Sequence, residues 1–259
     1  MKILGIESAS MTASVALVAD GITMGEYTVD FKKTHSQTLL PMIHEMVRML
    51  EFDLNDLDGI AVSGGPGSFT GLRIGSATAK GLGLALDKPL IHVPTLDAMA
   101  YGLYGASSLL CRMMDARRNQ VYTGLYYCKD KLDVVREACS MDREALTETL
   151  RKRGEQVIFL GDGTWEHEDA IRKHMGSLCR FAPAHLNRQR AAAVAALGAV
   201  YFAEGKTQTA MEHVPNYLRK AQAERELEEA KRQGKMQELA AGHSVGTGED
   251  RQIALGEGR

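Results

Sequence analysis

The sequence predicts an α/β protein with two lobes, because strand-like and helix-like patterns alternate along both halves of the chain. The first half opens with three strand-like runs, at Lys2–Ser8, Thr12–Ala19 and Ile22–Val29. Asp20-Gly21 joins the second run to the third with the preferred chemistry of a tight hairpin turn. We therefore expect the opening of the first lobe to be antiparallel.

The rest of the first lobe, residues 1–104, alternates helices with buried strands. The expected elements are a helix at about Thr38–Leu50, a strand Gly59–Ser63, a helix Phe69–Leu86, a strand Leu90–Val93 and a helix starting near Thr95. The resulting order is βββαβαβα. This order is typical of the actin-like (ASKHA, ribonuclease-H-like) lobe, and few other folds begin in this way.

Residues 105–219 predict a smaller, abbreviated second lobe followed by a C-terminal helix. The expected strands are Leu109–Asp115, Gln120–Tyr127 and Val157–Leu160, and the expected helices lie in 142–153, 166–174 and 189–203. Beyond Arg219 the composition changes, because Leu227 is the one large apolar residue of the charged segment 221–233, and glycines follow it. Such a segment cannot bury enough surface to offset the entropy of ordering, so 220–259 is expected to be a flexible tail.

Composition and charge exclude several classes of protein. The chain is 44% hydrophobic and 25% charged, and no apolar run reaches the roughly 20 residues that span a bilayer. Glu7 also places an acidic residue near the start of the chain, before the apolar core of a signal peptide could form. We therefore expect a cytosolic protein without a membrane partner. The four cysteines form no CxxC pair. A net charge of -2 without a basic cluster predicts that any contact with nucleic acid is indirect.

The glycine-rich stretch Gly64–Arg73 lies between a predicted buried strand and a predicted helix. Its freed backbone N–H groups could cradle an anion at the helix N-terminus. The alternative is a tight strand-to-helix crossing, with Ser68 or Thr70 as the helix N-cap, and local chemistry favours it. A P-loop is excluded, because the lysine it requires is absent and Leu72 stands nearby.

The helix after this stretch carries small residues four apart, at Gly71, Gly75, Ala79 and Gly83. Residues at that spacing share one face, and helical glycines cost roughly 1 kcal/mol each relative to alanine, so a compensating contact is expected. The sequence leaves two contacts open. The stripe packs either on the chain's own sheet or on the helix of a partner.

The preceding helix carries more apolar residues than a sheet-covering face requires. A stripe about 100° wide is already filled by Leu39, Ile43, Met46, Val47 and Leu50. Met42 and Met49 lie outside this stripe. This surplus predicts a second buried surface, to which adaptable methionine side chains are suited.

Two catalytic interpretations are weaker. Glu7, Ser8 and Ser10, with Asp162 and Gly163 from the second half, could form a vestigial nucleotide site, although the glycine pair that holds adenosine is absent. Two histidines on one helical face would be spaced three or four residues apart, and no pair here has that spacing, so neither a metal nor another cofactor is expected.

Arg117-Arg118, in a predicted hairpin, could bind an anion or could be a solvated hairpin tip.

Several strings make the interpretation specific. They are Ser36-Gln37 with Leu39-Leu40-Pro41, the stretch Gly64–Ile74, Ala79-Lys80-Gly81-Leu82, and Met114-Asp115-Ala116-Arg117-Arg118. Together with Ile6-Glu7-Ser8 they resemble the TsaB (YeaZ) family, densely over residues 1–127 and more thinly to about 219.

The resemblance implies a two-lobed fold and a non-catalytic subunit. Its partners would be the catalytic TsaD and the ATPase TsaE, in forming N6-threonylcarbamoyladenosine on tRNAs that read codons starting with A. It also implies that the two helices form the partner interface and that the isolated chain forms a homodimer. The implied interface residues are Leu39, Met42, Ile43, Met46, Met49, Gly71, Leu72, Gly75, Ala79 and Gly83.

Two rival functions remain, a degenerate actin-like phosphotransferase and a general self-associating protein. The interface hypothesis makes its own prediction. Met42→Glu or Gly75→Leu should abolish pairing with TsaD and leave the monomer folded. Deletion after Lys220 should leave stability unchanged.

Overall fold

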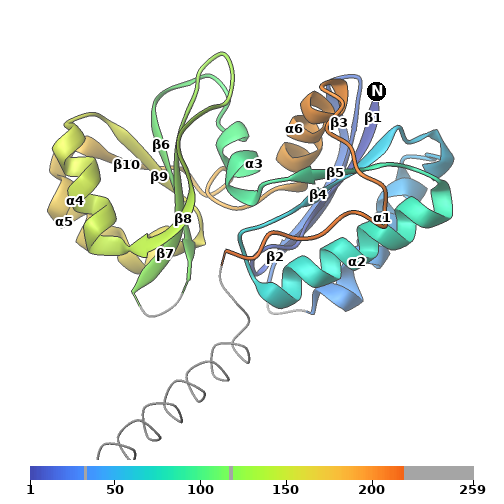
Figure 1. The fold of residues 1–259 in the computed structure, drawn as a ribbon, viewed down its shortest axis with the longest axis horizontal. Coiled ribbons are helices and arrows are strands. Elements are labelled where there is room, and N and C mark those ends of the chain that lie inside the picture. The colour runs from blue at the N-terminus through green and yellow to red at the C-terminus, as the bar shows by residue number, and fades with distance from the viewer. Residues whose placement is uncertain (32–33, 117–118, 219–259) are drawn as a thin grey trace, which may run out of the picture. The chain divides into compact units, whose positions relative to one another are not determined.

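The computed structural model describes residues 1–31, 34–116 and 119–218, which fold into two five-stranded sheets with helices on their faces. The strand orders are β3-β2-β1-β4-β5 and β10-β9-β6-β7-β8. Read from the opposite edge, the second order repeats the first, so each lobe has three antiparallel strands followed by two parallel additions. This arrangement confirms the predicted actin-like α/β fold (Figure 1).

The first sheet forms as the sequence predicts. Its strands are β1 (Lys2–Glu7), β2 (Thr12–Ala19), β3 (Ile22–Asp30), β4 (Gly59–Ser63) and β5 (Leu90–Val93). Asp20 and Gly21 adopt φ values of 50° and 79°, which two-residue hairpin turns of the I′ type require. Strand β1 is buried on both faces, with Leu4 and Ile6 on one side and Ile3 on the other.

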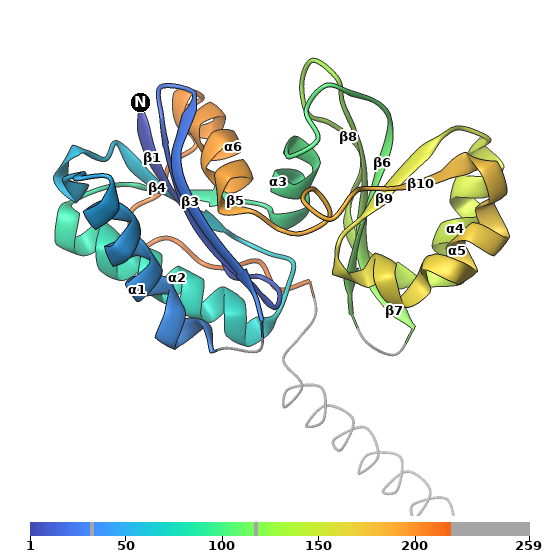
Figure 2. The same ribbon diagram turned by 180° about the vertical axis from the view of Figure 1, so that it is seen from behind.

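Helices cover both faces of this sheet. On one face lie α1 (His35–Met49) and α2 (Phe69–Leu86), which Figure 2 shows side by side. On the other lies α6 (Ala191–Ala203), so close that a Cβ at Gly5 would lie 2.3 Å from the Ala191 carbonyl oxygen. The sequence grouped α6 with the second lobe, whereas its contacts are with the first sheet. The short helix α3 (Thr95–Tyr101) follows β5.

The second lobe contains two strands that the sequence did not predict. Its sheet comprises β6 (Ala106–Asp115), β7 (Gln120–Cys128), β8 (Asp133–Asp142), β9 (Val157–Leu160) and β10 (Cys179–Phe181). Strands β8 and β10 were missed, because β8 is a half-exposed edge strand with charged residues and β10 has 3 residues. The helices of this lobe are shorter than α1 and α2, since α4 (Arg143–Arg153) and α5 (Glu168–Met175) have 11 and 8 residues, while β6, β7 and β8 have 10, 9 and 10.

Three short 3-10 helices complete the described elements, at Leu54–Asp56, Asp162–His167 and Gly176–Leu178. In the described part of the chain, no helix combines the length and the apolar character needed to cross a membrane.

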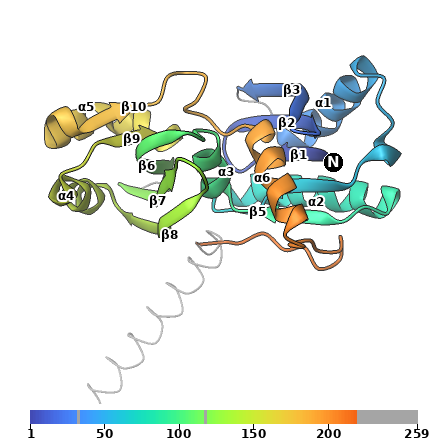
Figure 3. The ribbon, with the colours of Figure 1, turned by 90° about the horizontal axis from the view of Figure 1, so that it is seen from above.

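A C-terminal segment, residues 206–218, returns across the first lobe, and we call it the strap. Gln208 pairs with Leu90 at the edge of β5, and the Asn216 N–H donates to the Gly64 carbonyl at 2.6 Å. The Tyr217 ring lies 4.8 Å from the Phe69 ring at the start of α2. Figure 3 shows the strap running past α2 and β5. The predicted tail, 220–259, and Arg117-Arg118 lie outside the described residues.

Candidate functional site

A buried carboxylate ends strand β1. Glu7 is 1% exposed, and one of its oxygens accepts the Ala9 backbone N–H at 2.6 Å while the other accepts the Ser63 hydroxyl. Burial raises the pKa of Glu7 to about 7, although the Ser63 hydrogen bond opposes the shift. The Asp162 charge adds to the increase. Its surroundings therefore favour the protonated form of Glu7 more than water does.

The structure brings the second predicted acid, Asp162, toward the first. Asp162 follows β9, and its carboxylate accepts the backbone N–H of Gly163 at 3.0 Å and that of Asp115. Burial raises its pKa to about 6, while the Arg188 charge lowers it. The two acids come from different lobes, so their electrostatic interaction crosses the junction between the lobes.

The turn between β1 and β2 is where a phosphate would be gripped, and helix α2 occupies it. The Ser8 hydroxyl donates to the Gly71 carbonyl at 2.9 Å, and the Ser68 N–H donates to the Ala9 carbonyl at 2.6 Å. A Cβ at Gly67 would lie 2.3 Å from that same carbonyl oxygen. Ser10 accepts the Thr12 N–H at 3.2 Å. The polar groups of the predicted nucleotide site are thus engaged within the chain.

The glycine-rich stretch is the tight crossing that was favoured over an anion cradle. Ser68 is the N-cap of α2, and its hydroxyl accepts the Gly71 N–H at 3.3 Å. The Gly64 N–H donates to Val93, and the Gly65 N–H donates to the Thr95 hydroxyl at 3.2 Å. These N–H groups bind the chain itself rather than facing a ligand.

The small-residue stripe of α2 packs on the chain's own sheet, one of the two contacts left open. A Cβ would lie 2.1 Å from the Ser8 carbonyl oxygen at Gly71, and 2.2 Å from the Ser8 hydroxyl at Gly75. A Cβ at Gly83 would lie 3.0 Å from Leu90 Cδ2 and 3.1 Å from the Lys88 carbonyl oxygen, and Ala79 is fully buried. The stripe exists because α2 must approach the end of β1 this closely.

This packing corrects the expectation for Gly75→Leu. The side chain would have to displace the Ser8 hydroxyl, so we expect the substitution to destabilise the monomer rather than leave it unaffected. Leu72 is likewise fully buried and belongs to the core between the lobes.

The predicted α1 residues divide by exposure. Leu39, Ile43 and Met46 are buried in the first-lobe core, and Met42 is half-buried against it. Met49 is 64% exposed.

Two exposed leucines on the same helix pair were missed. Leu40 of α1 is 52% exposed and Leu84 of α2 is 61% exposed. The signal was present, because Leu84 falls on the side of α2 opposite the glycine stripe. We use the name exposed apolar face for the solvent-exposed side of the helix pair α1 and α2, whose large apolar residues are Leu40, Met49 and Leu84. Leu40 and Met49 are nine residues apart and so leave α1 on opposite flanks.

The histidines gather no metal ligands. No group of three or more His, Cys, Asp or Glu side chains suited to a metal occurs within 1–31, 34–116 and 119–218. His35 contacts the Thr12 carbonyl at 3.2 Å, and His44 is exposed. The His92 ring lies 5.5 Å from the ring of His213, a residue of the strap, between centroids.

Comparison with known proteins gives concordant relatives. Residues 29–227 match the model of the family TsaD, tRNA N6-adenosine threonylcarbamoyltransferase. The chain is 35% identical over 226 residues to the Bacillus subtilis (strain 168) tRNA threonylcarbamoyladenosine biosynthesis protein TsaB, covering 86% of this chain and 96% of that protein. It is 32% identical over 231 residues to the Escherichia coli K12 protein of the same name, covering 85% and 95%.

Solved structures agree in fold. An uncharacterized Pseudomonas aeruginosa protein with similarity to the peptidase YeaZ superposes with a TM-score of 0.73 at 25% identity, covering 84% of this chain and 99% of that one. The activator of the 2-hydroxyisocaproyl-CoA dehydratase from Clostridium difficile, solved with bound ADPNP, superposes with a TM-score of 0.51 at 9% identity, covering 79% and 97%. The dehydratase activator is similar to this chain in fold alone.

Proposed function

The chain belongs to the TsaB family, and residues 29–227 match the TsaD family model. On that premise, we propose that the chain is a non-catalytic subunit of the machinery that forms N6-threonylcarbamoyladenosine on tRNA. Its role is to pair with a TsaD-like catalytic subunit. The exposed apolar face of α1 and α2 is the observation that carries this proposal.

The exposed apolar face is costly in water and suited to a partner. Leu40, Met49 and Leu84 each leave about half or more of their surface exposed. Apolar side chains exposed on neighbouring helices favour a protein contact, because covering them removes apolar area from water. On α2 the exposed positions Ala77 and Gly81 are small, so another helix can approach its backbone there. The buried residues of the expected interface, including the glycine stripe, support this face from below.

A non-catalytic role is supported by the lobe junction. Glu7, Ser8 and Asp162 direct their hydrogen bonds to groups of the chain itself. A phosphate would have to displace α2 from the β1–β2 turn, and a magnesium ion at Glu7 would have to compete with the hydrogen bonds from Ser63 and Ala9. The junction is therefore better suited to holding the lobes together than to binding a nucleotide.

The remaining partners follow from the family. A TsaE-like ATPase would join the pair, and tRNA would bind through the more basic members of the assembly, in the cytoplasm. In the absence of the catalytic subunit, the same apolar face would be covered by a second copy of the chain as a homodimer.

Reconstitution tests this proposal. A TsaD-like enzyme and a TsaE-like ATPase are supplied with tRNA and threonylcarbamoyl adenylate, with and without the chain, and modified adenosine is measured. We expect modification to require the chain, and the purified chain alone to turn over neither ATP nor the adenylate. Release of ADP by the chain alone would instead support the degenerate phosphotransferase.

A further inference from the structure

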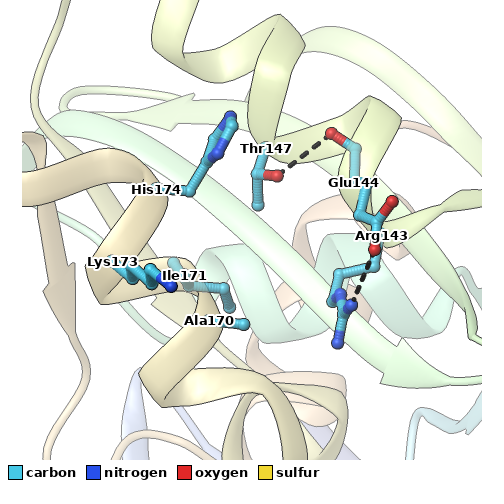
Figure 4. A pocket seen from close by; sticks show the side chains of 7 residues that line it. All are labelled: Arg143, Glu144, Thr147, Ala170, Ile171, Lys173 and His174. Atoms are coloured by element: carbon cyan, nitrogen blue, oxygen red, sulfur yellow. Dashed lines mark hydrogen bonds and ion pairs between the residues drawn. The ribbon is translucent and has the colours of Figure 1, made fainter.

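The second lobe has a cavity of about 430 Å³ between α4 and α5, remote in sequence from the exposed apolar face. Figure 4 shows its two walls, with Arg143, Glu144 and Thr147 from α4 and Ala170, Ile171, Lys173 and His174 from α5. This volume lies in the range of pockets that hold small molecules. Nothing in the proposed function uses it.

The floor of the cavity is apolar. Ile171 is fully buried and Thr147 is 5% exposed. The Thr147 hydroxyl donates its one hydrogen to the Glu144 carbonyl at 3.0 Å, so no hydroxyl donor remains for a ligand. A short aliphatic group would find methyl and methylene groups here.

The rim is charged, and most of its charges are already compensated. The Arg143 guanidinium binds the Glu144 carboxylate and the His167 Nδ1 atom, both at 3.1 Å. His174 Nε2 lies 3.1 Å from a Glu148 carboxylate oxygen. Both side chains are therefore held in fixed positions on the cavity wall.

Lys173 differs from these side chains. Its ammonium has neither a hydrogen-bond partner nor an ion-pair partner in the described part of the chain, and the residue is exposed. It supplies one uncompensated positive charge at the rim. Arg143 adds donors, because its two described contacts engage only part of the five N–H groups of a guanidinium.

We propose that this cavity binds a small monocarboxylate with a short aliphatic chain. The carboxylate lies between Lys173 and Arg143, and the aliphatic chain covers Ile171 and Ala170. Among the described lining residues, Lys173 supplies one uncompensated positive charge, which matches the single charge of a monocarboxylate better than the double charge of a dianion such as phosphate. A ligand of this size has few atoms with which to gain affinity, so dissociation constants on the order of millimolar are expected.

NMR titration of the full-length chain tests the proposal, with butyrate as the probe at constant ionic strength. We expect saturable shifts of the Lys173, His174 and Thr147 amides. Lys173→Gln should weaken butyrate about two- to fivefold, the range for an exposed ion pair. Lys152→Gln is the matched control, since Lys152 is an exposed lysine of α4 that pairs with Glu148 at 3.5 Å outside the cavity lining.

Filling the cavity gives a second variant. Ala170 is exposed, so Ala170→Leu should fold and should abolish the butyrate shifts. Inorganic phosphate and butylammonium serve as competing probes. The proposal is overturned if butyrate gives no saturable shift, if either competing probe shifts the same amides at equal or lower concentration, or if both substitutions leave the butyrate titration unchanged.

Discussion

The two lobes share one strand order and differ in what their helices present to solvent. In the second lobe, outward-facing side chains of α4 and α5 form ion pairs, such as Arg151 with Glu148 and Arg172 with Glu168. In the first lobe, α1 has one such pair, Arg48 with Glu45, and the helix pair also presents the exposed apolar face. Topology is therefore shared by both lobes, and the proposal that the first lobe binds a partner depends on its outward residues.

The lobes also differ in the hydrogen bonding of a buried charged side chain. Glu7 in the first lobe accepts hydrogen bonds on both carboxylate oxygens. Arg112 in the second lobe is fully buried, and its three side-chain nitrogens have no hydrogen-bond partner among the described residues. Burial lowers the pKa of Arg112 to about 9. The hydrogen bonds of Glu7 partly offset the cost of burying it, whereas Arg112 has no such compensation among the described residues and is a cost to the fold.

The largest expected effect comes from filling the close contact of α2. Gly75→Leu places a side chain where the Ser8 hydroxyl lies, and we expect it to lower the free energy of unfolding by about 3 kcal/mol or more. The matched control is Gly81→Ala on the same helix, where a Cβ meets no atom within 4 Å. That change should raise stability by up to about 1 kcal/mol. Urea denaturation measures both, and equal stability of the two variants would refute the packing argument.

Removing the uncompensated charge of the second lobe should stabilise it. Arg112→Met keeps an unbranched side chain of similar length without the charge, so we expect the free energy of unfolding to rise by about 1–4 kcal/mol. Glu7→Gln is the comparison in the first lobe. Thermal and urea unfolding at pH 7 measure both, and a destabilised Arg112→Met would mean that the guanidinium has a favourable contact in the folded protein.

A buried histidine of the strap, His213, is expected to lower the stability of the folded chain in mild acid. His213 is fully buried, its Nδ1 atom lies 3.3 Å from Gln208 Oε1, and its Nε2 atom has no hydrogen-bond partner among the described residues. Burial, aided by the charges of His92 and Lys80, lowers the pKa of His213 to about 4. The unfolded chain takes up this proton below pH 6.5 and the folded chain does not, so stability present above that pH is lost as the pH falls toward 4.

The expected loss from His213 is about 2 kcal/mol at pH 5. Glu7 acts in the opposite direction, because its raised pKa makes stability fall as the pH rises from 4.5 to about 7. The measurement is therefore the difference between the unfolding free energies of the wild type and His213→Asn across this range. His44→Asn, at an exposed site, is the control. A constant difference between wild type and His213→Asn would exclude His213 as the source.

Local signals in the sequence predicted most elements of the fold. Ser68 marked the start of α2, which begins at Phe69, and Asp20-Gly21 marked the first hairpin. The missed strand β8 carries Arg136 and Glu137 in a half-exposed edge, so its pattern resembles a loop. Local patterns cannot reveal strands that are stabilised mainly by their neighbours.

The site was predictable only in part, because periodicity tells which residues share a face and not what that face touches. Gly71 and Gly75 were correctly placed on one face, but their contact with Ser8 depends on residues more than sixty positions away. The burial of Arg112 and His213 depends in the same way on α3, the second sheet and the strap. Such long-range contacts required the structure.

The most direct test of the central claim compares one exposed apolar residue from each lobe. Leu84→Glu changes α2, and Val134→Glu changes β8, where the valine is 42% exposed. We predict that Leu84→Glu weakens binding to a TsaD-like subunit about tenfold or more, which is about 1.4 kcal/mol, with unchanged unfolding, while Val134→Glu binds as the wild type does. Calorimetric titration measures both affinities. Wild-type affinity for Leu84→Glu, or a loss confined to Val134→Glu, would contradict the assignment of the partner surface to the first lobe.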